Sequence, residues 1–210
     1  MSELTVGNLN VPPGEYEEGW IDGIELTTTH SVDIPVMAMN GEGEGPTLLM
    51  FSMQHGIEIQ NVGIVHSVMK DAVDPEDLHG QIIAIPVANP LAYMHATYRS
   101  WIDNGDLGYD TAEAPDGTPS ERLTAAVWEE AWSQADLVMN MHANTRQDSL
   151  PYQAIRVTED TIEEQERITY EEFGLTHDAF HAPPGRDEPV GLVHTLTMQA
   201  LLSYVDSGFC

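Results

Sequence analysis

Three apolar runs of strand length dominate the first two-thirds of this chain. They are TLLMFSM at 47–53, QIIAIPVA at 81–88 and ADLVMNMH at 135–142. Continuous apolar runs of this kind are typical of strands that are covered on both faces, whereas a strand with one face in water alternates apolar and polar residues. Strands covered on both faces belong to sheets with helices on each side, so the runs indicate an α/β protein.

Segments with helical periodicity lie between and after these runs. GIVHSVMKDAV (63–73) carries apolar residues at helical spacing, and Ser120 is the expected N-cap of the helix-forming run ERLTAAVWEEAW. Further along, the sequence predicts a strand in YQAIRVT and helices in EDTIEEQERITYEEFG and HTLTMQALLSYV. Strands that alternate with helices predict an α/β sandwich with a largely parallel central sheet.

Two other segments frame this core. Residues 16–39 alternate loosely and are rich in Ile, Val and Thr, which predicts two short antiparallel strands ahead of the first apolar run. The segment 89–119 is long and rich in Gly, Pro and Asp. Because ligands of such sheets gather at the carboxyl ends of the strands, we interpret this segment as a functional loop that crosses that edge.

Length and composition bound the class of protein. At 210 residues, 41% of them apolar, the chain is long enough for one domain, residues 1–210, with a substantial core. No stretch approaches the ~18 uninterrupted apolar residues of a membrane span, and the N-terminus lacks the basic and apolar regions of a signal peptide. The single cysteine is Cys210, so the sequence predicts no internal disulfide framework and a cytoplasmic location.

The charge of the chain is strongly acidic. Seven Lys and Arg residues face 35 Asp and Glu residues, giving a formal net charge of -28, and Lys70 is the only lysine. Such a surface repels nucleic acid and anionic membranes, so neither is expected as a partner. The acids are dispersed among apolar residues, and we interpret them as a halophile-type acidic surface. The alternative is a merely acidic protein from a mesophile.

A histidine and a glutamate follow the first apolar run in the sequence QHGIE. They are His55 and Glu58, and His142 stands at the end of the third run. Catalytic zinc sites use three His, Asp or Glu ligands and keep a fourth position open, so this trio is chemically complete for Zn²⁺. The alternative is structural: His55 bonded to a backbone carbonyl and Glu58 capping a helix N-terminus. The short motif alone does not decide between them.

Four segments, in a fixed order along the chain, carry a resemblance to a known protein family. They are GEGEGPTLLMFSMQHGIE, IIAIPVANPLAY, RSWIDNGDL and TPSERLTAAVWEEAWSQADLVMNMHANT. Together they resemble the succinylglutamate desuccinylase and aspartoacylase family, relatives of the zinc carboxypeptidases, over about residues 20–205. The resemblance implies a zinc carboxypeptidase-like three-layer α/β sandwich with a mostly parallel mixed sheet. It also implies Zn²⁺ held by His55, Glu58 and His142, and hydrolysis of the amide bond of a small N-acyl amino acid.

The same resemblance suggests roles for further residues. Arg99 matches the family arginine that stabilises a developing oxyanion; its alternative is a surface ion pair. Asp106 begins the stretch where the family has Asp-Leu-Asn-Arg, but glycine and Tyr109 replace the Asn and Arg that grip a substrate carboxylate. We predict Asp106 and Tyr109 as substrate-binding residues. Asn140 replaces the Asp of the family's Asp-Leu-His, and we expect its amide to orient a ligand histidine less strongly.

The general base is the feature that the resemblance does not supply. In the family, the base glutamate lies on a strand beyond the point that corresponds to LLSYVDSGFC, and a C-terminal β domain usually follows. We therefore expect residues 1–210 to form one catalytic domain without that β domain, and to hydrolyse substrate slowly. Glu171 and Glu188 are acids that could replace the base, and nothing in the sequence selects either.

Other interpretations of the chain remain open at this stage. His177 and His181 are expected at the surface, and the remaining histidines in the core or at the surface. A catalytically inactive metal- or ligand-binding remnant of the same fold is the main alternative to a deacylase. An acidic interaction module without metal leaves the ordered motifs unexplained. The substrate is a small molecule in the first interpretation, and a homo-oligomer is compatible with the sequence.

The acidic composition leads to a prediction about salt. With a net charge of -28, the folded chain is expected to lose stability as salt is diluted, because its carboxylates then repel one another without screening. Thermal melts from dilute to molar salt should show a rising midpoint, with a non-ionic osmolyte series as the control for solvent exclusion. A midpoint that does not change across the salt series would contradict the halophile interpretation.

Overall fold

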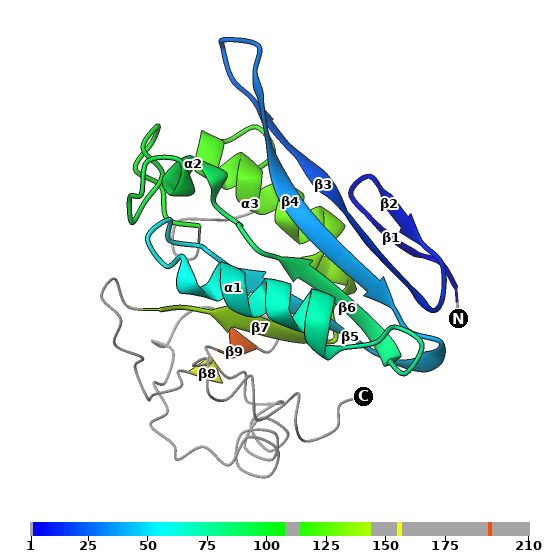
Figure 1. The fold of residues 1–210 in the computed structure, drawn as a ribbon. Coiled ribbons are helices and arrows are strands. Elements are labelled where there is room, and N and C mark those ends of the chain that lie inside the picture. The colour runs from blue at the N-terminus through cyan, green and yellow to red at the C-terminus, as the bar shows by residue number, and fades with distance from the viewer. Residues whose placement is uncertain (1, 108–113, 144–154, 157–192, 195–210) are drawn as a thin grey trace.

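A computed structural model describes residues 2–107, 114–143, 155–156 and 193–194 of the chain. These residues form a mixed sheet with helices on both faces (Figure 1). The order of the strands in the seven-stranded sheet is β3-β4-β6-β5-β7-β9-β8. The strands are β3 (Glu15–Glu25), β4 (Ser31–Asn40), β5 (Gly43–Ser52), β6 (His79–Ile85), β7 (Leu137–Met141), β8 (Ile155–Arg156) and β9 (Val193–His194).

The helices are short. They are α1 (Gln60–Ser67), which continues as a π-helical turn (Val68–Ala72), then α2 (Pro90–Tyr93), α3 (Pro119–Glu130) and a 3₁₀ turn (Trp132–Gln134). A separate hairpin of β1 (Leu4–Val6) and β2 (Leu9–Val11) precedes the sheet. None of the helices in the described part of the chain is long and apolar enough to span a bilayer.

The centre of the sheet is parallel. Strand β5 pairs in parallel with β6 and with β7, and β7 pairs in parallel with β9. The pairs β3–β4, β4–β6 and β8–β9 are antiparallel. The predicted α/β sandwich is therefore confirmed: the three apolar runs form its parallel centre, and antiparallel strands lie at both edges.

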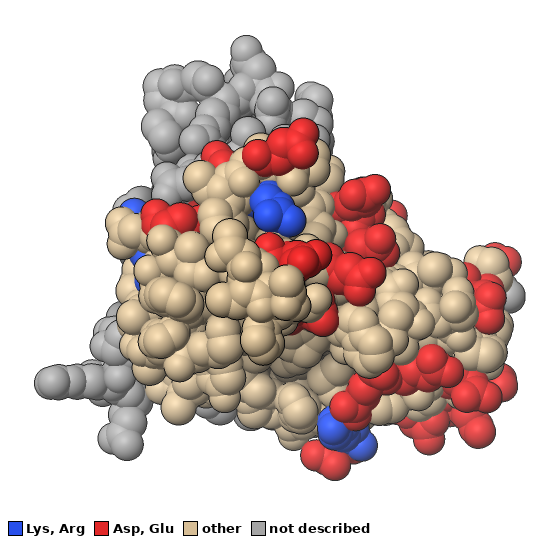
Figure 2. All heavy atoms as spheres, turned by 90° about the horizontal axis from the view of Figure 1, so that it is seen from above, with Lys and Arg blue, Asp and Glu red and all other residues tan. Residues whose placement is uncertain are grey.

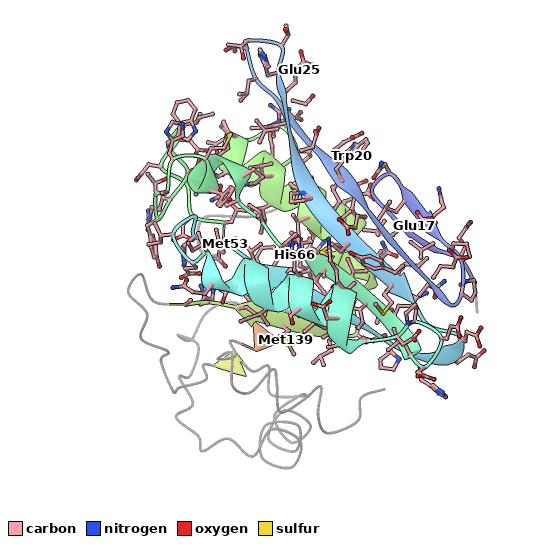
Figure 3. All side chains as sticks on the ribbon, in the orientation of Figure 1. Glu17, Trp20, Glu25, Met53, His66 and Met139 are labelled. Atoms are coloured by element: carbon pink, nitrogen blue, oxygen red, sulfur yellow. The ribbon has the colours of Figure 1, made fainter. Side chains whose placement is uncertain are left out.

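The two faces of the sheet bury separate apolar cores. In β5, Leu49 and Phe51 belong to the core shared with α3, whereas Leu48 and Met50 belong to the core shared with α1. Side chains alternate between the faces of a strand, so a run that is apolar at every position is needed to fill both cores. Met139 of β7 lies on the α1 side, as Figure 3 shows.

The N-terminal strands differ from the prediction. Strands β3 and β4 are 11 and 10 residues long rather than short, with a register shift between Ile21 and Ile24. Their hairpin projects beyond the rest of the described fold, with Glu25 near its tip (Figures 1 and 3). The β1–β2 hairpin was not predicted, because strands of three residues carry little periodic signal. Its turn begins at Gly7, whose φ of 54° favours glycine.

The start of α3 corrects a second prediction. The N-cap is Thr118, not Ser120: its hydroxyl accepts from the Glu121 N–H, and the Glu121 carboxylate accepts from the Thr118 N–H. This reciprocal capping box is followed by Pro119 at the first helical position. Thr118 is the N-cap because it stands three residues before a glutamate that completes the capping box. The Ser120 hydroxyl instead donates to Asp103.

The other predicted helices are only partly described. The first helix begins at Gln60, ahead of the predicted 63, and its last turn is π-helical. His194, the first residue of the predicted helix HTLTMQALLSYV, lies in strand β9 instead, because it pairs with β7 and β8. The rest of that segment and EDTIEEQERITYEEFG lie outside the described residues.

Charged side chains follow the composition. Figure 2 shows Asp and Glu side chains spread over one face of the molecule, with few Lys or Arg side chains among them. Lys70, at the end of the first helix, lies 2.8 Å from a carboxylate oxygen of Glu18 on β3. Both side chains are largely exposed, so the pair contributes ~1 kcal/mol or less to stability.

Asp103 joins the loop after α2 to the start of α3. Its carboxylate accepts from the Ser120 N–H at 2.7 Å, the Ser120 hydroxyl at 2.8 Å and the Gly105 N–H at 3.0 Å. Partial burial alone would raise the pKa of Asp103. The hydrogen bonds from Ser120 and Gly105 outweigh burial and hold this pKa below its ordinary value.

We expect Asp103→Asn to lower the stability of the fold at neutral pH by about 1–2 kcal/mol, the usual loss of hydrogen bonds to a charged acceptor. Because the folded pKa is lowered, the stabilisation is present above the unfolded pKa of ~3.9 and is lost as pH falls below it. Denaturant unfolding across acidic pH should therefore show a weaker pH dependence in the variant. Asp71→Asn, at an exposed acid on the π-helical turn, is the control. Parallel pH curves for wild type and Asp103→Asn would contradict the prediction.

Candidate metal centre

The turn after β5 delivers the first site residues. Strand β5 ends at Ser52, and Met53 is buried with a φ of 58°, in the left-handed region that few non-glycine residues occupy. The loop after β6 holds this turn: the Ala88 N–H donates to the Ser52 carbonyl at 2.9 Å, and the Asn89 N–H to the Met53 carbonyl at 3.1 Å. Figure 3 places Met53 at the end of the sheet where α1 begins. The strained backbone therefore turns the chain sharply at the point where His55 must enter the site.

Helix α2 packs directly on this turn. A Cβ atom at Gly56 would lie 2.1 Å from the carbonyl carbon of Ala92, so only glycine fits there. Asn89 caps α2 by accepting from the Ala92 N–H at 2.9 Å, and its amide donates to the Gln54 carbonyl at 3.2 Å. The Asn-Pro pair in the sequence thus fixes α2 against the turn that carries His55.

Three side chains converge at the carboxyl edge of the sheet. The Nδ1 atom of His55 lies 2.9 Å from Oε1 of Glu58, and Nδ1 of His142 lies 3.2 Å from Oε2 of the same carboxylate. The two Nδ1 atoms are 3.2 Å apart. Asn61 on α1 donates to the Met141 carbonyl at 2.9 Å, which fixes the end of β7 against the helix that follows Glu58.

The trio has the chemistry and the spacing of a metal site. One ligand atom from each of the three residues lies within 4.8 Å of the others, and His55 and Glu58 are buried. Ligand atoms at 2.0–2.1 Å from a tetrahedral zinc are about 3.3 Å apart. The observed separations of 2.9, 3.2 and 3.2 Å are close to this value, so these residues fit one divalent ion.

The electrostatics of the trio favour a ligand carboxylate. Burial alone would raise the pKa of Glu58. The hydrogen bonds with His142 and His55 outweigh burial and lower this pKa below its ordinary value. The carboxylate is therefore held in its charged form, which is the form that binds a cation.

A second group of polar residues lies behind the His55 ring. Its Nε2 atom is buried, makes no hydrogen bond within the described residues, and faces Oδ1 of Asp106 at 3.6 Å. The Gln54 amide donates to the same Oδ1 at 3.1 Å, and the Asn140 amide donates to Oε1 of Gln54 at 3.1 Å. Nε of Arg99 lies 3.7 Å from Oδ2 of Asp106.

An aromatic ring covers His55. The ring of Tyr98 stacks on the imidazole with a centroid distance of 3.7 Å and an interplanar angle of 17°. Tyr98 is itself about half exposed, at 47%. The Tyr98 ring therefore packs on one face of the His55 imidazole, and Arg99 is the next residue along the chain.

The structure brings most of the predicted residues together. His55, Glu58 and His142 form the cluster, Asp106 and Asn140 lie behind it, and Arg99 is 42% exposed at its edge. Tyr109, Glu171, Glu188, His177 and His181 lie outside the described residues. Four histidines that were predicted to lie in the core or at the surface are exposed: His30, His66, His79 and His95.

Two residues of the site were not predicted from the sequence. Gln54 is the first residue of QHGIE, and Tyr98 directly precedes Arg99, so each stands beside a residue that was selected. An aromatic or amide neighbour of a candidate ligand is the signal that could have identified them. Neither residue type is an acid or a usual metal ligand, so a pattern of ligand-type residues in the sequence does not include them.

The fold and the position of the cluster indicate the broad class of protein to which the chain belongs. A sheet with a parallel centre, covered by helices on both faces, is the zinc carboxypeptidase-like fold, and the His, Glu and His cluster that could hold a metal lies at its carboxyl edge. A metallo-carboxypeptidase from Burkholderia cenocepacia shares this fold, with a TM-score of 0.65 at 12% identity over 93% of this chain and 63% of that chain. Residues 44–185 match the succinylglutamate desuccinylase/aspartoacylase catalytic domain. The chain therefore belongs to this family, as the sequence predicted.

Individual relatives agree with this assignment. The chain is 28% identical over 166 residues to the N-alpha-acetyl-L-2,4-diaminobutyric acid deacetylase of Halomonas elongata, which covers 79% of this chain and 45% of that protein. The chain thus spans less than half the length of this curated relative. A succinylglutamate desuccinylase/aspartoacylase structure from Rhodobacter sphaeroides has a TM-score of 0.71 at 19% identity, covering 97% of this chain and 66% of that one. The ectoine utilization protein EutE (DoeB) of Ruegeria pomeroyi also gives 0.71, at 20% identity, covering 94% and 67%.

Proposed function

We propose that this chain is the catalytic domain of a zinc-dependent hydrolase that removes the acyl group from a small N-acyl amino acid. One observation carries the proposal: the Nδ1 atoms of His55 and His142 lie 3.2 Å apart and both face the Glu58 carboxylate. Two histidines and one glutamate form a ligand set of catalytic zinc sites, which keep one position open. Family membership and the similarity to a deacetylase support cleavage of an amide bond.

Each of the three residues has a defined part in holding the metal. His55 and His142 would bind through Nδ1, and Glu58 through its carboxylate. Zinc, when bound there, supplies Lewis-acid chemistry, because it acidifies water and polarises an acyl carbonyl. The protein contributes the placement: a buried turn holds His55 and Glu58, and the end of β7 holds His142.

Asp106 supports the site from behind. It was predicted as a substrate-binding residue, but its side chain is almost fully buried and its Oδ1 faces His55 Nε2 at 3.6 Å. This placement favours a role in orienting the ring over direct contact with substrate. A carboxylate behind a ligand histidine fixes its tautomer and makes it a stronger ligand.

Arg99 is the cation that we assign to the substrate. Its side chain is 42% exposed, and Asp106 lies 3.7 Å from its Nε atom, so the guanidinium is tethered at the edge of the site with surface left to bind a ligand. A fixed guanidinium suits an oxyanion that develops during amide hydrolysis. Together with the stacked Tyr98 next to it, this supports Arg99 as the group that stabilises that charge.

A second candidate function rests on the acids of the site. The described residues bring two carboxylates to it, Glu58 and Asp106, and both already contact histidine ligands. Neither is placed to accept a proton from water as a general base. This favours, as the alternative, a member of the family that binds metal and ligand without rapid turnover.

The metal site leads to a direct prediction. We expect one zinc per chain after dialysis, and expect His55→Ala and His142→Ala each to lose it, because two remaining ligands hold zinc weakly. Elemental analysis of the purified proteins is the measurement. His66→Ala, at an exposed histidine of α1, is the matched control and should retain zinc. Full zinc occupancy in the His55 and His142 variants would show that the ligands are assigned wrongly.

Turnover separates the two candidate functions. We expect the 210-residue chain to hydrolyse N-acyl amino acids in a zinc-dependent reaction, and a chain without general-base assistance would do so about 10²- to 10⁴-fold more slowly. The panel contains N-acetyl and N-succinyl amino acids, including N-alpha-acetyl-L-2,4-diaminobutyrate, assayed with and without zinc. Zinc-dependent turnover lost in Arg99→Met supports the deacylase. Calorimetric binding of the panel without any turnover favours the inactive alternative, and rapid turnover would mean that a residue outside the described part supplies the base.

A further inference from the structure

Gln54 occupies the centre of a buried chain of hydrogen bonds. Its side chain accepts from the Asn140 amide at 3.1 Å and donates to Oδ1 of Asp106 at 3.1 Å. Asp106 Oδ1 in turn faces Nε2 of His55 at 3.6 Å. All four residues are 9% exposed or less, so water does not compete for these contacts.

The direction of every bond in this chain is determined. A carboxylate oxygen can only accept, so Gln54 must turn its Nε2 towards Asp106 and its Oε1 towards residue 140. Residue 140 must then donate, which an asparagine does through Nδ2 and an aspartate cannot. Within the described residues, Asn140 Oδ1 has no hydrogen-bond partner, so this side chain contributes a donor and nothing else.

We propose that Gln54 is a positioning residue that transmits the identity of residue 140 to the metal ligand His55 through Asp106. Asn140 sets the orientation of the Gln54 amide, Gln54 fixes Oδ1 of Asp106, and Asp106 orients the His55 ring from its Nε2 side. The inference rests on the proposed function of His55 as a zinc ligand. It assigns to Asn140 an effect opposite to the one expected from the sequence, where its amide was predicted to weaken the site.

The proposal predicts the sign of a conservative change. In Asn140→Asp, the new carboxylate accepts only, so the Gln54 amide rotates to donate to residue 140 and presents its oxygen to Asp106. Two acceptors then face each other, and Asp106 no longer holds the His55 ring. We expect zinc affinity to fall by about 10- to 100-fold, the usual loss when the partner of a ligand histidine is disturbed.

A double variant tests whether residue 140 acts through Gln54. In Gln54→Met, Asn140→Asp, no amide links residue 140 to Asp106, so the change at residue 140 can no longer affect His55 by this route. We expect the double variant to bind zinc about as well as Gln54→Met alone, and so more tightly than the product of the two single effects allows.

The experiment measures zinc affinity by competition with a chelator, together with thermal melts of the zinc-free proteins. Gln54→Met and Gln54→Glu should weaken zinc binding by about 10- to 100-fold. Gln134→Met, whose amide bonds the Thr5 carbonyl away from the site, is the matched control and should bind normally. Melts show whether each variant is folded, and the double variant tests the chain even where a single variant is destabilised.

The outcomes distinguish this proposal from the proposed function. Wild-type protein that binds no zinc would overturn the proposed metal centre, and with it the positioning role of Gln54. Normal zinc binding by wild type, together with unchanged zinc affinity in Gln54→Met, would overturn only the positioning role of Gln54. Tighter zinc binding in Asn140→Asp, or losses in the double variant equal to the product of the single losses, would overturn it as well.

Discussion

The position of β5 between β6 and β7, parallel to both, is the constraint on which the site depends. Leu49 pairs with Ile83 on one side and with Val138 on the other, so all three strands end at the same edge of the sheet. This register brings His55 and His142 together although they are 87 positions apart in the sequence. A shift of one residue along β7 would move its end by ~3.3 Å and reverse its side chains to the other face. Either effect alone would remove His142 from the cluster.

The two apolar cores strengthen the interactions between polar groups at this edge of the sheet. Apolar side chains fill both faces of β5, so the buried turn that follows it sits in a region with little water. Polar groups in such a region are costly unless paired and strong when paired. Hydrogen bonds through Gln54 link Asp106 and Asn140 behind His55, while Glu58 faces the two histidines in front. The fold thus supports the His55 ring from the side opposite the His55, Glu58 and His142 cluster that could hold a metal ion.

Predictions from the sequence agreed with the structure where one short segment determines the local conformation. The apolar runs became the parallel strands because burial on both faces requires an apolar residue at every position. Predictions failed where two local signals competed or where neither was strong. Ser120 and Thr118 both suit an N-cap, and Glu121 decided for Thr118 through the capping box. His194 lies in β9 because pairing with neighbouring strands, which no helical periodicity records, determines its conformation.

The sequence by itself determined the chemistry of the candidate site, because His55, Glu58 and His142 are ligand-type residues at or just after the ends of strands. It also determined which strands are buried, because a strand covered on both faces is apolar at every position. Only the tertiary structure decided which strand ends adjoin and what lies behind the ligands. The Gln54–Asp106 and Gln54–Asn140 hydrogen bonds join residues 52 and 86 positions apart. No periodicity or spacing relates such residues, because their contact depends on strand order and on the path of the loop after α2. The direction of each bond then follows from elementary chemistry, since a carboxylate accepts and an amide can do both.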